Sequence, residues 1–185
     1  MAATGTGTRA ALYFRRYTAI DLAMLGVVAA VSGVVFALTW NVYEFGKAIG
    51  GPVIARIVSY GLWFIGAPLG AALVRKPGAA FLGETLGAFV ETIIPTLGGW
   101  TNLVYGALQG LASEAAYALF HYRKWGTPQA ALAGAFAGPV AVALDAVLFA
   151  EIAPPPVITI WAIAATISGA IYGAAAHLAA TTIKR

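Results

Sequence analysis

Five polar side chains lie inside apolar sequence in the middle of the chain, where they could bind a small ligand. They are Glu84, Glu91, Asn102, Gln109 and Glu114. Carboxylates accept hydrogen bonds or pair with a cation, whereas side-chain amides both donate and accept. An ionisable side chain within a membrane-spanning segment costs about 2.5–3.5 kcal/mol on insertion scales, so it marks a functional site by default. These residues are therefore the first candidates for a binding site.

Spacing places the two acids of the first apolar segment on one face of a helix. Glu84 and Glu91 are seven residues apart, which is close to two turns. If the helix starts near Ala79, a rise of 1.5 Å per residue puts Glu84 about 8 Å and Glu91 about 18 Å from that start. We therefore expect the two carboxylates at different depths.

The second apolar segment runs in the opposite direction and carries a polar stripe. Its polar residues follow an i, i+3, i+7, i+11 pattern from Asn102 to Ser113, which is one helical face. Gln109 would lie about 12 Å below the outer end, with Glu114 deeper still. We predict an upper level made by Glu91, Asn102, Tyr105 and Gln109, and a lower level made by Glu84 and Glu114.

The upper level has the chemistry of a pocket for a flat heteroaromatic ligand. Its amides and carboxylate can hydrogen-bond to ring substituents, and each stacked aromatic ring adds about 0.5–1.5 kcal/mol. A cationic ring would gain cation–π attraction as well. The alternative is that these groups hydrogen-bond only between helices. We expect the pocket to be completed by Trp40, Tyr43, Asp145 and Trp161.

The lower level has three possible roles. Glu84 and Glu114 could share a proton, since close like charges raise one pKa. They could instead anchor helix packing, or they could form the floor of a deep pocket. The residues alone leave these three readings open.

Composition sets the class of protein. The chain has 185 residues, of which 61% are hydrophobic and 10% are charged, against about 25% charged in a typical soluble domain. Its mean hydropathy is +0.83, and apolar segments of about 20 residues recur, which is typical of a polytopic α-helical membrane protein. The net charge of +4 does not indicate nucleic acid, because the basic residues cluster between apolar spans. There is no cysteine and there are two histidines, so we expect no disulfide, metal site or cofactor.

Charge placement predicts the topology of a single, all-α membrane domain over residues 1–185. Nine of the 11 basic residues fall in segments that would face the cytoplasm, which leaves Lys47 and Arg56 outside. Both termini would then be cytoplasmic, in a multi-pass protein of the plasma membrane. After a cytoplasmic arm at 1–17, we predict six spans at 18–40, 52–74, 79–94, 100–122, 128–150 and 157–183.

Several local features carry expectations of their own. Residues 41–51 are predicted as an outer loop, either at the membrane interface or as a lid over the pocket. Arg56 should reach the surface or pair with Glu44. Asp21 should pair with Arg15 and Arg16 at the inner end of the first span. We expect Pro68 to kink the second span, and the prolines at 154–156 to prevent helix formation.

The central hairpin resembles the membrane-embedded substrate-binding (S) components of energy-coupling factor (ECF) vitamin transporters. The resemblance is strongest to the YkoE-like family, which is linked to thiamine or its hydroxymethylpyrimidine precursor. It is carried by about fifty residues: the turn at 75–79, the helix with Glu84 and Glu91, the Gly98-Gly99 turn, the run at 106–110 leading to Glu114, and the end at 122–124.

The resemblance implies a six-helix fold with an outward-facing vitamin pocket. It also implies docking onto a transmembrane coupling (T) subunit that is driven by two cytoplasmic ATPases, with the S component toppling in the membrane. Ala19 and Ala23, four residues apart, look like the small-residue docking surface of related S components.

Two other functional classes were weighed. A stand-alone ion-coupled secondary carrier would use Glu84 or Glu91 for coupling, but we find no internal repeat of the kind such carriers show. An enzyme would need a recognisable catalytic constellation, and no GxSxG or HExxH motif occurs. There is also no P-loop, so we do not expect the chain itself to hydrolyse ATP.

Overall fold

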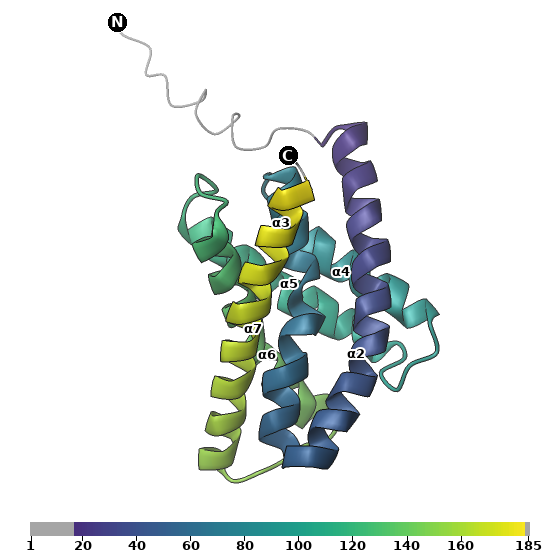
Figure 1. Cartoon of the computed structure of the whole chain (residues 1–185), viewed down its shortest axis with the longest axis vertical. Helices are drawn as coiled ribbons and strands as arrows, with labels where there is room; N and C mark the ends of the chain where they lie inside the picture. Colours follow the sequence, from purple (N-terminus) through teal and green to yellow (C-terminus); the bar gives the residue numbers. More distant parts are fainter. Residues whose placement is uncertain (1–16, 184–185) are drawn as a thin grey trace, which may run out of the picture.

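The computed structural model describes residues 17–183, and over that range the regular elements are helices and no strand occurs (Figure 1). Three stretches are long and apolar enough to cross a membrane, namely Ala19–Val74, Thr127–Leu148 and Pro155–Thr182. The predicted arm lies almost wholly outside the described residues. The elements are α2 (Ala19–Ser59), the 3-10 helix η1 (Tyr60–Phe64), α3 (Gly66–Val74), α4 (Ala79–Ile93), α5 (Thr101–Leu119), α6 (Thr127–Leu148) and α7 (Pro155–Ile183).

The predicted outer loop at 41–51 is wrong, because α2 stays helical through it. The chain instead reverses at Gly51, whose backbone has φ 71° and ψ −168° inside α2, a conformation that favours glycine. The two arms pack closely beside this turn: a Cβ on Gly46 would lie only 2.9 Å from the Cα of Ala55. Packing against the returning arm stabilises the helical conformation of the residues before Gly51. The first two predicted spans are therefore joined by a tight turn at Gly51, and the second is made up of the end of α2, η1 and α3.

The helical arm that returns after Gly51 is interrupted before Pro68, the residue at which a kink was predicted. The irregular stretch is η1 with Ile65, whereas Pro68 lies in the first turn of α3, where a missing N–H costs no helical hydrogen bond. Within η1, the N–H of Gly61 donates to Ser168 Oγ on α7 at 2.9 Å. A Cβ on Gly61 would lie 2.3 Å from the Ser168 carbonyl oxygen. Close contact with α7 thus accompanies the break.

The α4–α5 hairpin is short, as predicted, and α4 has 15 residues, or about 22 Å. In Figure 1 its connecting loop ends well short of the end of the molecule formed by the Gly51 turn. Glu114 of α5 holds the base of the hairpin, because its carboxylate accepts from the N–H groups of Gly78 (2.6 Å), Ala80 (3.0 Å) and Phe81 (3.0 Å). Of the three readings, helix anchoring is therefore the one that Glu114 fits.

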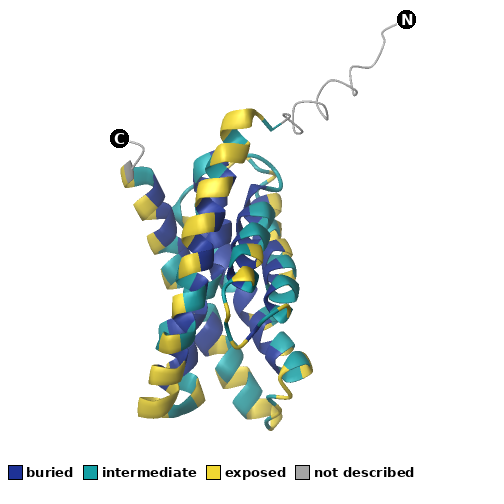
Figure 2. Ribbon diagram, turned by 90° about the vertical axis from the view of Figure 1, so that its right-hand side faces the viewer, coloured by how far each residue is buried: buried dark blue, intermediate teal, exposed yellow. Residues whose placement is uncertain are grey.

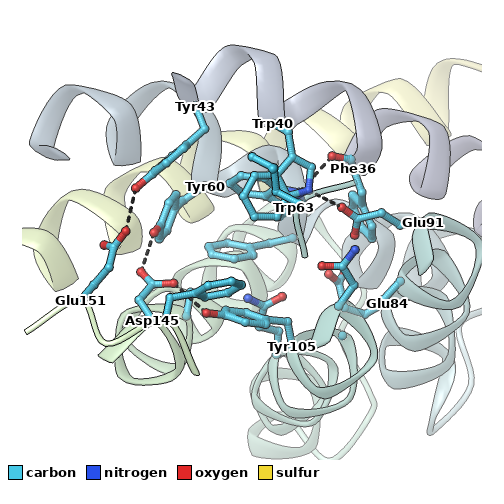
Figure 3. Close-up of a pocket in the computed structure, with 18 of the residues that line it drawn as sticks. Phe36, Trp40, Tyr43, Tyr60, Trp63, Glu84, Glu91, Tyr105, Asp145 and Glu151 are labelled. Carbon is cyan, nitrogen blue, oxygen red and sulfur yellow. Dashed lines mark hydrogen bonds between the residues drawn. The ribbon is translucent and has the colours of Figure 1, made fainter. Parts of the chain in front are cut away.

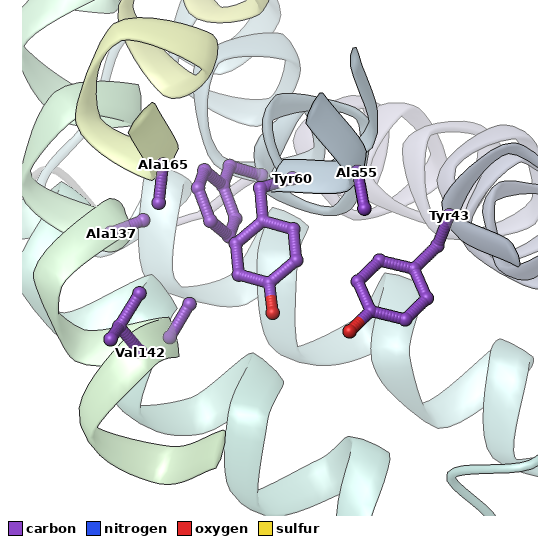
Figure 4. Packing of buried hydrophobic residues seen from close by; sticks show 8 residues of the cluster. Tyr43, Ala55, Tyr60, Ala137, Val142 and Ala165 are labelled. Carbon is purple, nitrogen blue, oxygen red and sulfur yellow. The ribbon is translucent and has the colours of Figure 1, made fainter. Parts of the chain in front are cut away.

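Helices α6 and α7 form a long pair held together by small residues. A Cβ on Gly134 would lie 2.0 Å from the carbonyl oxygen of Gly169, so the two backbones touch there. Ala137 and Ala165 continue the contact toward Tyr60 (Figure 4). The expectation that the prolines prevent helix is wrong, since α7 begins at Pro155. Proline is tolerated in the first helical turn.

The described ends of the chain lie together at one end of the molecule (Figure 1). There Asp21 pairs with Lys76 and caps α2 together with Thr18. Arg15 and Arg16, its predicted partners, lie outside the described residues. The outer side of α2 is exposed and apolar, at positions that include Val27 (62% exposed) and Leu38 (61% exposed) (Figure 2). Such a face suits contact with lipid.

Candidate functional site

A cavity of about 310 Å³ lies between α2, η1, α4, α5, α6 and the segment that joins α6 to α7. Its size is within the range of small-molecule sites. Trp161 does not line it; its ring instead lies 4.2 Å from Cζ of Arg56. The other predicted binding residues all line the cavity, and their binding role stays a prediction: Glu91, Gln109, Asn102, Tyr105, Glu84, Trp40, Tyr43 and Asp145.

Aromatic rings form one wall of the cavity (Figure 3). Trp40 and Trp63 meet edge to face with centroids 5.1 Å apart, and Tyr60 lies 5.8 Å from Trp63. Hydrogen bonds fix both indoles: Trp40 Nε1 donates to Glu91 Oε1 at 2.9 Å, and Trp63 Nε1 donates to the carbonyl oxygen of Phe36 at 3.0 Å. This wall offers fixed ring faces and edges to a flat ligand.

Glu84 lies at the buried end of the cavity and is 1% exposed. Its Oε2 accepts from the N–H of Ala67 at 2.8 Å, whereas Oε1 is buried with no hydrogen-bond partner among the described residues. Leaving a buried acceptor unpaired costs about 1–3 kcal/mol. Glu84 therefore tethers α4 to α3, and it retains one buried, unused acceptor in a side chain that borders the cavity.

The two amides of α5 are also buried beside the cavity. Asn102 is 6% exposed and donates through Nδ2 to Thr96 Oγ1 at 3.1 Å. Gln109 is 4% exposed and lines the cavity about two helical turns further along α5. Three residues of the predicted stripe, Asn102, Tyr105 and Gln109, therefore face one space together with Glu84 and Glu91. The fourth, Ser113, instead donates to the carbonyl oxygen of Ala133 on α6 at 3.0 Å.

A second polar group at the opposite side of the cavity was not predicted as a unit. Arg56 has a fully buried side chain, so the expectation that it reaches the surface or pairs with Glu44 is wrong. Its Nη2 contacts Asp145 Oδ2 at 3.1 Å and also pairs with Glu151. We call Arg56, Asp145 and Glu151 the arginine network. Asp145 and Glu151 line the cavity, and Arg56 lies behind them.

Three tyrosine hydroxyls are oriented by the two carboxylates of the arginine network (Figure 3). Tyr60 and Tyr105 donate to Asp145, the latter at 2.9 Å, and Tyr43 donates to Glu151 at 3.2 Å. Sequence reasoning did not place Tyr60, Trp63 or Glu151 among the binding residues, although all three line the cavity. The sequence did contain one usable signal, because Glu151 and several aromatic residues lie close to helix ends on the predicted outer side. The same signal singled out Trp40 and Tyr43 as binding candidates.

Two further expectations concern the cavity rim and metals. Glu44 and Lys47 lie at the rim on α2, so residues 41–51 border the cavity as a helix rather than as a flexible lid. Among the described residues, no cluster of three or more His, Asp or Glu side chains is placed to hold a metal ion.

Comparison with known proteins gives three matches. Residues 20–140 match the model of a family described as "ABC-type cobalt transport system, permease component". The "Putative HMP/thiamine permease protein YkoE" of Bacillus subtilis (strain 168) is 34% identical over 111 residues, which are 58% of this chain and 56% of that protein. The chain thus matches a little over half the length of this relative.

The third match is a solved structure described as "Crystal structure of an S-component of ECF transporter". It superimposes with a TM-score of 0.79 and 26% identity, covering 91% of this chain and 84% of that one. These matches confirm the resemblance carried by the central hairpin. They also confirm, together with the apolar helices, a multi-pass membrane protein whose relatives are transport proteins rather than enzymes.

Proposed function

We propose, given that this chain belongs to the family of ABC-type cobalt transport system permease components, that it is the substrate-binding S component of an ECF importer. Its ligand would be thiamine or hydroxymethylpyrimidine. The names printed for its relatives support this proposal, since one is an HMP/thiamine permease and another an ECF S component. No chemical transformation is needed for this role, only capture of the ligand in a cavity within the membrane.

The observation that carries the proposal is that Glu84, whose Oε1 is buried and unpaired, lines a cavity walled by tryptophans. An aminopyrimidine presents an N–H donor on the edge of a flat ring. The donor would satisfy Glu84 Oε1, while the ring would lie against Trp40 or Trp63. Glu91 and Gln109 would contact the remaining polar groups.

The proposed orientation follows from the two ends of the molecule. Six crossings would place both termini on the same side of the membrane, and the described ends of the chain lie together at one end of the molecule (Figure 1). The basic residues Arg75, Lys76, Arg123 and Lys124 lie in the two turns that precede α4 and α6. The cavity would then open to the outside.

Partners are proposed from the same resemblance. A T subunit and two ATPases would drive uptake, and the T subunit would dock on the exposed side of α2 that carries Ala19 and Ala23. The small side chains at these two positions would allow a partner helix to approach closely. The bilayer would cover the remaining apolar surface.

Binding of vitamins to the purified chain tests the proposal. Isothermal titration calorimetry in detergent should detect nanomolar binding of thiamine or hydroxymethylpyrimidine, and weaker or no binding of other flat vitamins such as riboflavin. The Glu84→Gln chain is the matched control, because it keeps the acceptor for Ala67 but loses the free carboxylate oxygen. No binding of either compound to a monodisperse parent chain would contradict the proposed ligand.

The alternative is a stand-alone ion-coupled secondary carrier for a small heteroaromatic solute. The observation in its favour is that the buried acids Glu84 and Glu91 line one cavity. Reconstitution in liposomes separates the two functions. An S component should show no flux of labelled thiamine without the ATPase module, whereas flux by the lone chain under an ion gradient would establish the carrier.

A further inference from the structure

The segment between α6 and α7, residues 149–154, is held to α2 chiefly through one side chain. We call it the 149–154 segment. Ile152 is 80% exposed, whereas Phe149 is 43% exposed and its ring lies 6.1 Å from that of Tyr105. The N–H of Glu151 donates to the carbonyl oxygen of Asp145 at 3.2 Å, so within the described part of the chain the backbone is tied to α6 but not to α2. Ala150 has φ 53°, which turns the chain. Glu151 then lines the cavity and reaches Arg56 and Tyr43.

Arg56 is a fixed anchor for that side chain. Its side chain is fully buried, its Nη1 donates to the carbonyl oxygen of Pro52 at 3.3 Å, and its guanidinium lies against Trp161. The anchor belongs to the part of α2 just after the Gly51 turn. It is therefore part of the packed body of the protein rather than of a loop.

The two acids that Arg56 contacts differ in exposure. The side chain of Asp145 is 10% exposed and that of Glu151 is 30% exposed. Asp145 also receives two tyrosine hydroxyls, from Tyr60 and Tyr105, whereas Glu151 receives one, from Tyr43. Asp145 alone can neutralise Arg56 when Glu151 leaves. The pair with Glu151 is consequently the more solvent-accessible half of the arginine network, and its carboxylate is the one that water can solvate on release.

We propose that the Arg56–Glu151 pair is a latch that closes the 149–154 segment over the cavity. Arg56 acts as the positioning residue, and release of Glu151 opens a side of the cavity to ligand. Only the identity of the ligand rests on the proposed function. The latch itself concerns the chain without ligand.

Distance measurement on the ligand-free chain tests the latch directly. The chain has no native cysteine, so spin labels can be attached at Phe45→Cys and Ile152→Cys, which replace residues 66% and 80% exposed. Double electron–electron resonance should give a narrow distance distribution in the parent. Glu151→Gln should broaden it or add a longer distance, because a neutral amide loses the ion pair with Arg56.

A matched control removes a different acid at the same rim. Glu44→Gln removes a negative charge from the cavity rim without touching Arg56, so its distance distribution should equal that of the parent. Arg56→Lys provides a second perturbation of the pair, since it keeps the charge but loses the planar fork, and it should broaden the distribution as Glu151→Gln does. Distributions in both latch variants equal to that of the parent would overturn the proposal.

Ligand kinetics give an independent readout. With thiamine as the probe, Glu151→Gln should raise the dissociation rate constant at least tenfold while leaving the association rate constant unchanged or higher. A purely structural role would lower thermal stability without this separation of the two rates. If the parent binds no thiamine, the distance measurements still decide on the latch, so failure of the proposed ligand and failure of the latch are distinguishable.

Discussion

Two groups of acids line the same cavity, yet the protein satisfies them to very different degrees. In the arginine network, Asp145 and Glu151 receive an arginine and three tyrosine hydroxyls from within the chain. On α4, the described donors to Glu84 and Glu91 are uncharged, among them the N–H of Ala67 and the indole of Trp40, and one oxygen of Glu84 has no partner among the described residues.

The difference separates structural acids from acids that await a ligand. A buried carboxylate without a cation is costly unless something else supplies charge or donors. Within the arginine network, the buried Arg56–Asp145 pair therefore reads as architecture, with Glu151 as its releasable member, and the pair on α4 reads as the recognition element. Substitutions at the two places should have opposite consequences for stability and for binding.

The largest effect is expected from Arg56→Gln. Removing one member of a buried ion pair leaves two carboxylates without their cation, which costs about 3–5 kcal/mol of folding free energy. The variant should unfold at a much lower temperature than the parent when both are followed by intrinsic fluorescence in detergent. An unchanged unfolding temperature would break the comparison, since the arginine network would then not be architecture.

Glu84→Gln should behave in the reverse way. The new amide oxygen can still accept from Ala67, and the amide nitrogen replaces an unpaired acceptor, so stability should be maintained. Binding of thiamine should weaken at least tenfold, or about 1.4 kcal/mol, because the acceptor for the ligand is lost. Calorimetry together with thermal unfolding checks both halves, and a stable variant with parental affinity would contradict the role of Glu84.

Substitutions in the upper level should weaken binding by a similar or smaller amount. Glu91→Gln and Gln109→Ala are each expected to lower thiamine affinity at least tenfold, about 1.4 kcal/mol. Trp161→Phe is the matched control, because Trp161 lies behind Arg56 and does not line the cavity. Its affinity should stay within about twofold of the parent. Unchanged affinity in the first two variants would place the ligand elsewhere.

The smallest effect is expected from Glu114→Gln. This variant tests whether Glu114 has a structural role while Glu84, the other acid of the predicted lower level, binds the ligand. Glu114 caps the start of α4 and lies outside the cavity. Loss of a charged cap should cost about 1 kcal/mol of stability and leave ligand affinity unchanged. A drop in affinity comparable to that of Glu84→Gln would show that both acids serve the ligand.

The parts that sequence predicted best are those governed by local spacing. Glu91, Asn102 and Gln109 lie on two adjacent helices, so helical rise and periodicity were sufficient to bring them to one space. Glu84 was predicted at a lower level, and it lines the same cavity. The short α4 was predicted for the same reason. Contacts within one hairpin need no knowledge of the rest of the fold.

The parts that sequence missed depend on long-range packing. Arg56 meets acids 89 and 95 residues away in the chain, and nothing local distinguishes them from Glu44. The helical continuation through residues 41–51 depends on the close approach of Gly46 to Ala55 across the Gly51 turn. Trp161 was predicted to complete the pocket, but its ring lies against Arg56 and does not line the cavity.

The cap that Glu114 places on α4 has an electrostatic consequence for the turn at Arg75 and Lys76, which lies beside the start of that helix. The start of a helix carries a partial positive charge from its aligned peptide dipoles and exposed N–H groups, which makes it a natural seat for phosphate. Here three of those N–H groups are already occupied by a carboxylate from the same chain. The positive end of the α4 dipole, next to the basic turn at Arg75 and Lys76, is therefore already neutralised. The three N–H groups that Glu114 occupies are not available to bind a phosphate group or a nucleotide there.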